Sequence, residues 1–351
     1  MRLHRLLACL FAFLPCLAAE PETASGAKPE AVLVVPACDV TGMTEVFALR
    51  DAEMTLSVVD LESLLIGLTP EEIARLVPEG EVKLHTQAFL LKREGLNILV
   101  DAGAGKGQGG VMLESLALAG VQPEDVDAVL LTHLHFDHVG GLEHDGEAVF
   151  PKAAIHLSQD ELDAWTTDEG VTRLPDSQKD WAVLAQKALA PYAGRIHAFS
   201  RNPEILFPFL DGGAEYRLVH VPTPGHTPGH AWYVLGQTGT DASVCFAGDL
   251  WHLAEIQMAR PETTLVFDVD PEQARGWRVG GRRTPHDEGF LSFLAKNAED
   301  MRSSGMAAFV AVAGAHLPFP GIGMVEAREE GFAFVPFAEY LDAAGSGRGD
   351  P

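Results

Sequence analysis

The segment HLHFDH at positions 133–138 contains four side chains that commonly bind metal ions. It follows the apolar run Ala128 to Leu131, which is typical of a strand, so we expect it to form the loop at that strand's end. In extended backbone, residues two apart point the same way, which lets His133 and His135 converge on one ion. The Asp and His that end the segment can then turn toward a second ion. A structural zinc site would normally use cysteines, and this segment has none, so the pattern favours a catalytic metal site.

Three later segments place further metal ligands just beyond apolar, strand-like runs. Glycines beside these ligands allow the backbone to approach closely. The ligands are His226 in TPGHTPGH, Asp249 in AGD and His316 in AGAH. Imidazole and carboxylate together suit zinc and also accept iron, manganese or cobalt. We therefore expect several strand ends to converge on one site for divalent ions.

Strand-like and helix-like segments alternate along the chain without an internal repeat or linker, which predicts one mixed α/β (α+β) domain with helices covering sheets. Thr69 followed by PEE marks a helix start, because it combines a capping residue, an N-terminal proline and acids in the first turn. The first two predicted strands are close enough to form a hairpin. The predicted strands are Lys83–Leu91, Leu96–Val100, Ala128–Leu131, Ala153–Leu157, Arg217–Val221, Ala231–Leu235, Ser243–Phe246 and Ala307–Val312. The predicted helices are Pro70–Leu76, Val111–Ala119, Gln159–Trp165, Gln178–Leu189 and Phe290–Arg302.

The N-terminus has the pattern of a secretory signal peptide. Arg2 and Arg5 precede the apolar run Leu6 to Leu14, and small residues follow up to Ala19. The run is too short to span a bilayer, so we expect no membrane anchor. We predict cleavage of residues 1–19 and a periplasmic or secreted protein. The mature chain would comprise a flexible leader over 20–35, a single domain over 36–345 and a flexible tail over 346–351.

The chain is strongly acidic, with a formal net charge of -25. Such a charge repels phosphate backbones and anionic lipid surfaces, which argues against nucleic acid as a partner and favours small neutral substrates. Cys38 and Cys245 remain after the predicted cleavage, and export would permit a disulfide between them. Cys245 lies in an apolar run, however, where a buried thiol in a strand is favoured.

The ligand pattern resembles that of the metallo-β-lactamase-fold superfamily at seven positions: His133, His135, Asp137, His138, His226, Asp249 and His316. The resemblance implies a four-layer αβ/βα sandwich with the metals at one edge. Further segments, 99–103, 225–230, 316–323 and 331–340, are similar to the periplasmic methyl parathion hydrolase branch and its related lactonases.

This resemblance also implies a role for each ligand. His133, His135 and His226 would hold the first of two divalent ions, and Asp137, His138 and His316 the second. Asp249 would bridge them, and Asp249 and Asp137 are the candidate catalytic carboxylates. Two ions about 3.5–4 Å apart would share a hydroxide as nucleophile. His230 has no counterpart among the family's ligands and is expected to form hydrogen bonds or to pack. Asp101 is expected to orient a ligand histidine or to support a loop rather than to bind metal.

The candidate substrate pocket consists of the aromatic residues Phe136, Trp165, Trp251 and Phe319, which would form an apolar cleft. The stretch 277–288 departs from the branch and is expected to be an exposed loop. The sequence thus predicts an exported hydrolase with two ions, most often zinc, that opens lactones or cleaves phosphotriesters. Thioester hydrolysis, β-lactam hydrolysis and a non-catalytic metal-binding sensor remain alternatives. The oligomeric state, a homodimer for example, is left open.

Overall fold

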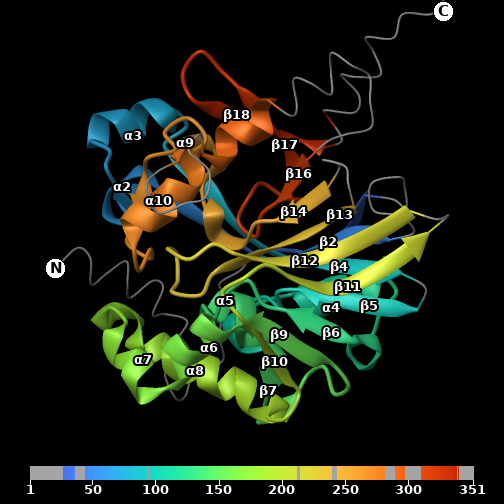
Figure 1. Ribbon diagram of the computed structural model, residues 1–351. Coiled ribbons are helices and arrows are strands. Elements are labelled where there is room, and N and C mark those ends of the chain that lie inside the picture. The colour runs from blue at the N-terminus through green and yellow to red at the C-terminus, as the bar shows by residue number, and fades with distance from the viewer. Residues whose placement is uncertain are drawn as a thin grey trace, which may run out of the picture.

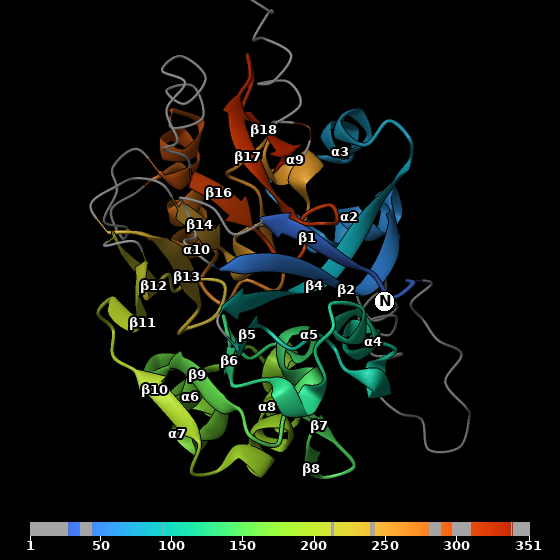
Figure 2. The same cartoon turned by 90° about the vertical axis from the view of Figure 1, so that its right-hand side faces the viewer.

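The computed structural model describes residues 27–35, 44–93, 95–211, 214–238, 243–280, 289–296, 310–337 and 339. Two seven-stranded sheets lie face to face, with helices on their outer sides (Figures 1 and 2). This confirms the predicted sandwich fold. In spatial order, the first sheet contains β1 (Ala31–Val35), β2 (Glu45–Ser57), β4 (Glu81–Arg93), β5 (Leu96–Val100), β6 (Ala128–Leu130), β9 (Ala154–Ser158) and β10 (Ile196–Phe199). The second contains β11 (Glu204–Asp211), β12 (Ala214–Pro222), β13 (Ala231–Gln237), β14 (Ser243–Phe246), β16 (Val310–Ala313), β17 (Ile322–Ala327) and β18 (Phe332–Pro336).

The central core lies between the two sheets and draws apolar side chains from both. Phe89 of β4 meets Phe246 of β14 with ring centroids 5.5 Å apart. Leu91 and Val100 of the first sheet and Leu235 of the second belong to the same buried cluster. The burial of each such side chain contributes roughly 1.5–3 kcal/mol to the stability of the fold. The packing of these side chains therefore holds the two sheets together.

Two further cores lie under the helices. Helices α4 (Met112–Leu118), α6 (Gln159–Thr166) and α8 (Lys179–Leu189) cover the first sheet. Helix α10 (Pro271–Val279), the short α9 (Ala254–Gln257) and helical residues 290–296 cover the second. At one end, α2 (Val58–Leu64) and α3 (Pro70–Leu76) enclose a smaller core. The remaining elements are α5 (Phe136–Val139), α7 (Asp168–Arg173) and two short strand pairs, β3 (Leu65–Ile66) with β15 (Thr264–Leu265) and β7 (Glu143–His144) with β8 (Glu147–Ala148).

Most predicted elements are present within a few residues of their expected bounds. Helix α3 begins and ends as predicted, and Thr69 and Glu72 form the reciprocal cap that fixes its start. Strands β4 and β5 form the predicted antiparallel hairpin, in which Phe89 pairs with Val100. Residues 290–296 confirm the start of the last predicted helix, while 297–302 lie outside the described residues, as do 307–309 of the strand predicted there.

Two sequence-based expectations need correction. Residues 31–35 were assigned to a flexible leader, but they form β1, whose backbone pairs with β2 from Ala31 opposite Leu49 onward. Trp277 and Arg278 were assigned to an exposed loop, but both are buried at the end of α10. The Arg278 guanidinium donates hydrogen bonds to the carbonyls of Leu250, Pro261 and Thr263, which satisfies its buried charge.

Several predictions concern residues that the structure does not describe. The predicted signal peptide, the tail and most of the stretch 277–288 lie outside the described residues, as does Cys38. Cys245 is a free, buried thiol in β14, as its apolar neighbours predicted. Among the described helices, none is long and apolar enough to cross a membrane.

Candidate metal centre

The seven predicted ligands come from loops that follow strands, and the fold gathers these loops at one edge of the sandwich. His133, His135 and the start of α5 follow β6 of the first sheet, and the other ligands follow strands of the second. Asp249 lies in a short 3₁₀ turn, η6 (Gly248–Leu250), directly after β14. His226 lies between β12 and β13, and His316 follows β16. The centre is therefore assembled from both sheets.

The ligand atoms form two compact groups. The first consists of His133, His135, His226 and Asp249, whose ligand atoms all lie within 4.8 Å of one another. The second consists of Asp137, His138 and His316, with the same limit. These are the two sets that the resemblance implied. Asp249 belongs to the first, and it also forms a third group of possible ligands with His252 and His316.

Asp249 reaches both groups through its two carboxylate oxygens. Its Oδ2 lies 3.3 Å from Nε2 of His226 and 3.1 Å from Nε2 of His316. Its Oδ1 lies 3.1 Å from Nε2 of His138. One carboxylate thus faces an imidazole of each group, which is the arrangement that a bridging ligand needs.

Three of the histidines are held from behind by an acceptor. Nδ1 of His138 lies 2.8 Å from Oδ2 of Asp101, and Nδ1 of His226 lies 2.9 Å from Oδ1 of Asp268. Nδ1 of His316 faces the backbone carbonyl of His85. With the proton on Nδ1, each ring presents a free Nε2 lone pair to the site. Asp101 therefore orients a histidine, as predicted, whereas Asp268 was not found from the sequence.

The buried polar atoms at the centre fit a divalent cation. Nε2 of His133, Nε2 of His138 and Oδ1 of Asp249 are buried without a hydrogen-bond partner. Leaving such atoms unpaired costs about 1–3 kcal/mol each. In addition, Nδ1 of His135 and Nε2 of His226 lie 3.0 Å apart and face each other. Inward-facing imidazole nitrogens and carboxylate oxygens suit zinc and similar ions, which would satisfy all of them.

The electrostatics of the centre favour positive charge. Burial alone would lower the pKa of His226, but Asp249 and Asp268 outweigh it and raise the pKa to about 9. For His138, Asp249 and Asp101 likewise overcome burial and raise the pKa. Burial dominates at His133 and holds its pKa well below the usual value. The carboxylates that attract protons here would attract metal cations in the same way.

The centre opens into a small cleft of about 40 Å³. This volume has room for ions and water, so the bulk of a substrate must lie at the mouth of the cleft. Four of the lining residues are predicted ligands: His135, Asp137, Asp249 and His316. The others are His252 and the apolar residues Leu84, Phe136, Trp181 and Phe267.

Only Phe136 among the four predicted pocket residues lines this cleft. Trp165 is fully buried in the core under the helices, where its ring meets His135 edge-on at 5.2 Å. Trp251 is also fully buried and stacks with Phe290 in the outer core of the second sheet. Phe319 packs against the core between the sheets, beneath the guanidinium of Arg50 at 4.1 Å. These three therefore do not line this cleft, and in the structure they pack in or against the cores.

Two cleft residues had weak or absent signals in the sequence. His252 is buried, and its Nε2 lies 3.1 Å from Oδ2 of Asp249. Its place three residues after Asp249 was a signal that could have revealed it. Phe267 belongs to an irregular segment far from any ligand motif, so only the fold brings it to the cleft.

His230 is near the centre but supports it from outside. Its Nε2 accepts the backbone N–H of Asp249 at 3.2 Å, and its Nδ1 lies 2.9 Å from the hydroxyl of Thr223. Burial lowers the pKa of His230 to about 3, so the ring stays neutral and can accept. This agrees with the expectation that His230 is a hydrogen-bonding residue rather than a ligand.

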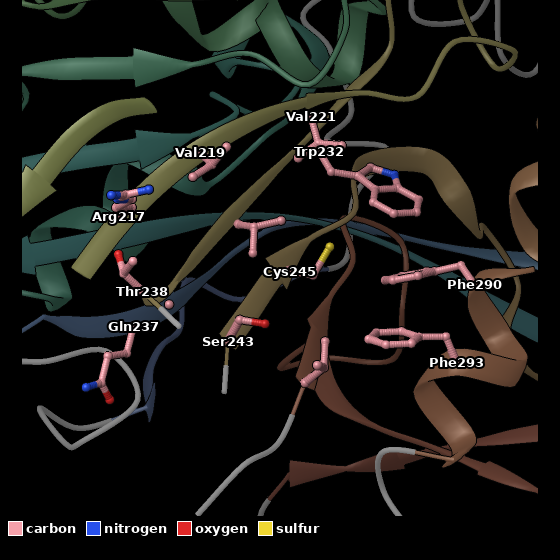
Figure 3. A pocket seen from close by; sticks show the side chains of 13 residues that line it. Arg217, Val219, Val221, Trp232, Gln237, Thr238, Ser243, Cys245, Phe290 and Phe293 are labelled. Atoms are coloured by element: carbon pink, nitrogen blue, oxygen red, sulfur yellow. The ribbon is translucent and has the colours of Figure 1, made fainter. Parts of the chain in front are cut away.

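A larger cavity of about 420 Å³ lies on the outer face of the second sheet (Figure 3). Its walls include Val219, Trp232 and Cys245 from the strands, with Phe290 and Phe293 opposite. Burial raises the pKa of the Cys245 thiol, so it is not an activated nucleophile.

The family model of the metallo-beta-lactamase superfamily matches residues 83–282, more than half of the chain. Among curated proteins, the chain is 30% identical to the probable metallo-hydrolase YflN of Bacillus subtilis over 157 residues, covering 43% of this chain and 54% of that protein. It is 49% identical to metallo-beta-lactamase domain-containing protein 1 of Mus musculus over 63 residues, covering 18% and 22%. The chain thus spans about half or less of these relatives' lengths.

Two solved structures are similar over nearly the whole chain. The hydrolase AbOPH of the beta lactamase superfamily is 28% identical with a TM-score of 0.68, covering 90% of this chain and 98% of that one. AidC, a dizinc quorum-quenching lactonase in complex with a product, is 22% identical with a TM-score of 0.69 and the same coverage. The second likeness concerns the fold alone.

Proposed function

Because the chain belongs to the metallo-beta-lactamase superfamily, we propose that it is a dinuclear-metal hydrolase that opens lactones. One observation carries the proposal: the carboxylate of Asp249 contacts both groups of ligands, and it lies at the base of a cleft with apolar walls. Two bound divalent ions, for which we propose zinc, would supply a water of near-neutral pKa and polarise the oxygen under attack.

The chain's own residues would prepare the centre for this chemistry. Asp249 fixes the spacing between the two groups of imidazoles, because its carboxylate contacts His226 of the first group and both His138 and His316 of the second. Asp101 and Asp268 hold His138 and His226 with Nε2 directed inward. Asp137, whose side chain is 20% exposed, lies nearer to solvent and lines the cleft. We therefore propose it as the carboxylate that meets incoming substrate.

The walls of the cleft support a neutral ester substrate. Leu84, Phe136, Trp181 and Phe267 are uncharged and partly face the opening. A lactone has a planar ester group that fits a narrow space between aromatic rings. A phosphotriester is the second candidate, since it is also neutral and suits apolar walls. Its tetrahedral phosphorus carries three organic groups, however, and needs more room around the reacting atom than the planar ester of a lactone.

The test is a substrate panel with a metal count. The purified protein is assayed against acyl lactones of increasing chain length, aryl phosphotriesters, thioesters and β-lactams, before and after dialysis against a chelator. We expect two ions per chain, highest kcat/KM on lactones, and loss of turnover on chelation that zinc restores. Fewer than two ions, or turnover that survives their removal, would exclude the proposed chemistry. Preference for thioesters or β-lactams would keep the metal centre and replace the substrate class.

We also propose that the protein acts outside the cytoplasm, after removal of residues 1–19. The supporting pattern is the pair Arg2 and Arg5 followed by the apolar run and Ala19. N-terminal sequencing of protein from fractionated cells should find a chain that begins at Glu20 in the exported fraction. A chain that keeps Met1 and remains in the cytoplasm would contradict this.

A further inference from the structure

Glu161 lies in the first turn of α6, where an acid commonly marks only a helix start. Its neighbour Asp160 follows that pattern: it stays partly exposed and pairs with Arg201 at 2.7 Å. Glu161 differs, because it is fully buried. Burying a carboxylate is costly unless protein groups replace the hydrogen bonds that water would make to it, so Glu161 must have specific partners.

These partners are the two loops that carry the first group of metal ligands. One oxygen of Glu161 accepts the backbone N–H of Leu134 at 2.9 Å, and the other accepts that of Gly229 at 2.8 Å. Leu134 lies between His133 and His135, and Gly229 follows His226 by three residues. A single carboxylate therefore joins the loop after β6 to the loop between β12 and β13.

The contact between α6 and the second loop is close enough to exclude any side chain at position 229. A Cβ at Gly229 would lie 2.1 Å from the backbone nitrogen of Glu161 and 2.7 Å from its Cα. The loop thus rests directly on the helix, and the hydrogen bond from Gly229 fixes it there. The buried carboxylate of Glu161 and the missing side chain at Gly229 are two independent features of the same contact between α6 and this loop.

The junction at Glu161 joins both loops that supply the histidines of the first metal group, whereas it touches only one of the two loops that carry the second group. The first group takes its three histidines from the two loops that Glu161 joins. The second group includes His316, which follows β16 and is held by the carbonyl of His85. Loss of Glu161 would therefore allow the two loops of the first group to move apart. Asp101 and the carbonyl of His85 would still hold His138 and His316.

We propose that Glu161 is a positioning residue of the metal centre, which sets the distance between the two loops so that His133, His135 and His226 meet at one ion. The inference rests on the metal-binding part of the proposed function. It adds a residue outside the ligand set, and outside their direct hydrogen-bond partners, to the machinery of the centre.

The test measures zinc affinity at each site separately. His316→Ala leaves the first site alone, and His226→Ala leaves the second. Glu161→Gln is added to each background, because glutamine keeps the size but places an NH₂ group against one of the two N–H donors. The matched control is Asp160→Asn, which removes a carboxylate from the same helical turn without touching either loop. Zinc dissociation constants come from chelator competition, cobalt absorption spectra report ligand geometry, and thermal unfolding of the metal-free proteins reports stability.

We expect Glu161→Gln to weaken zinc binding at the first site by about 10–100-fold, the usual cost of losing an outer support of a metal ligand. The second site and the Asp160→Asn variants should keep their affinities, and the cobalt spectrum should change only in the first-site background. Unchanged affinity at the first site would overturn the proposal. Equal weakening of both sites together with a lower unfolding temperature would also overturn it, because that is the result of a purely structural role.

Gly229→Ala provides a second route to the same junction if Glu161→Gln does not fold. It should weaken the first site selectively by forcing the loop away from α6, and retention of affinity would again contradict the inference. If the unmodified chain binds no zinc, the proposed function itself fails. If it binds two ions and Glu161→Gln leaves the first unaffected, only the role of Glu161 fails.

Discussion

In the described part of the chain, histidines gather in two places, and only one of them has the surroundings of a metal centre. At the metal centre, His138 and His226 each face a carboxylate behind the ring and Asp249 in front. The other place is an inter-sheet group, His156 of β9, His197 of β10 and His220 of β12. There His156 stacks on His197 at 5.0 Å, and His220 lies 4.8 Å from the ring of Phe199.

Two members of the inter-sheet group, His156 and His220, are kept neutral. Burial lowers the pKa of His156 to about 4, with a smaller contribution from His197, and burial also lowers the pKa of His220 to about 4, although Glu204 opposes it. Both nitrogens of His220 are buried without a hydrogen-bond partner. Both places bring histidine rings together, and the carboxylates make the difference, because they stabilise protons or cations that aromatic neighbours do not.

The largest effect should come from removing the carboxylate shared by both ligand groups. Asp249→Ala should reduce kcat/KM on the best substrate by more than about 100-fold, since losing even an outer support of a ligand costs about 10–100-fold. Metal analysis should find fewer than two ions per chain. His220→Phe, in the inter-sheet group, should keep both ions and full activity. Retained activity in Asp249→Ala would remove the basis of the comparison.

An intermediate effect is expected from the carboxylate behind His226. Asp268→Asn keeps the shape of the side chain but removes the charge that holds Nδ1 of His226 at 2.9 Å. We expect zinc affinity at the first site to fall by about 10–100-fold. Asp163→Asn is the control, because this exposed residue contacts Gln159 on α6 rather than a ligand. Equal affinities in both variants would show that the acid behind the ring is dispensable.

The structure brings together the side chains that the sequence predicted as ligands, each of which follows a recognisable apolar strand in a short motif. His226 and His316, for example, lie beside glycines that mark the turn after the strand. The outer supports were harder to find. Asp268 and Glu161 belong to segments whose local pattern indicates only a loop or a helix start, and their partners are 42 and 68 residues away along the chain. Only the packing of the two sheets brings such groups together.

Strand β2 is one of the elements that the sequence did not predict, because its pattern is mixed. Strand β2 contains Arg50, Asp51 and Glu53, which interrupt the apolar alternation. A register shift between Arg50 and Ala52 lets the Asp51 carboxylate turn inward, where it accepts the N–H groups of Ala104 and Met112. Arg50 and Glu53 pair with each other and with other charges at the surface. Tertiary pairing therefore stabilised a strand that local composition disfavoured.

The smallest predicted effect concerns the pH dependence of stability at the inter-sheet group. The folded chain keeps His220 neutral down to about pH 4, whereas an unfolded histidine takes up a proton near pH 6.5. Between these values the unfolded state binds more protons, so this group makes stability fall as pH decreases from about 6.5 to 4. His220→Phe removes that contribution and suits the neighbouring rings of Phe199 and Tyr233. Urea unfolding of the chelated protein from pH 7.5 to 4 should therefore show a shallower loss of stability, by at most about 1.4 kcal/mol per pH unit.

The exposed His144 provides the control, and His144→Gln should follow the unmodified protein. Parallel curves for His220→Phe and the unmodified chain would mean that His220 is charged in the folded state, and the contrast between the two histidine groups would then disappear.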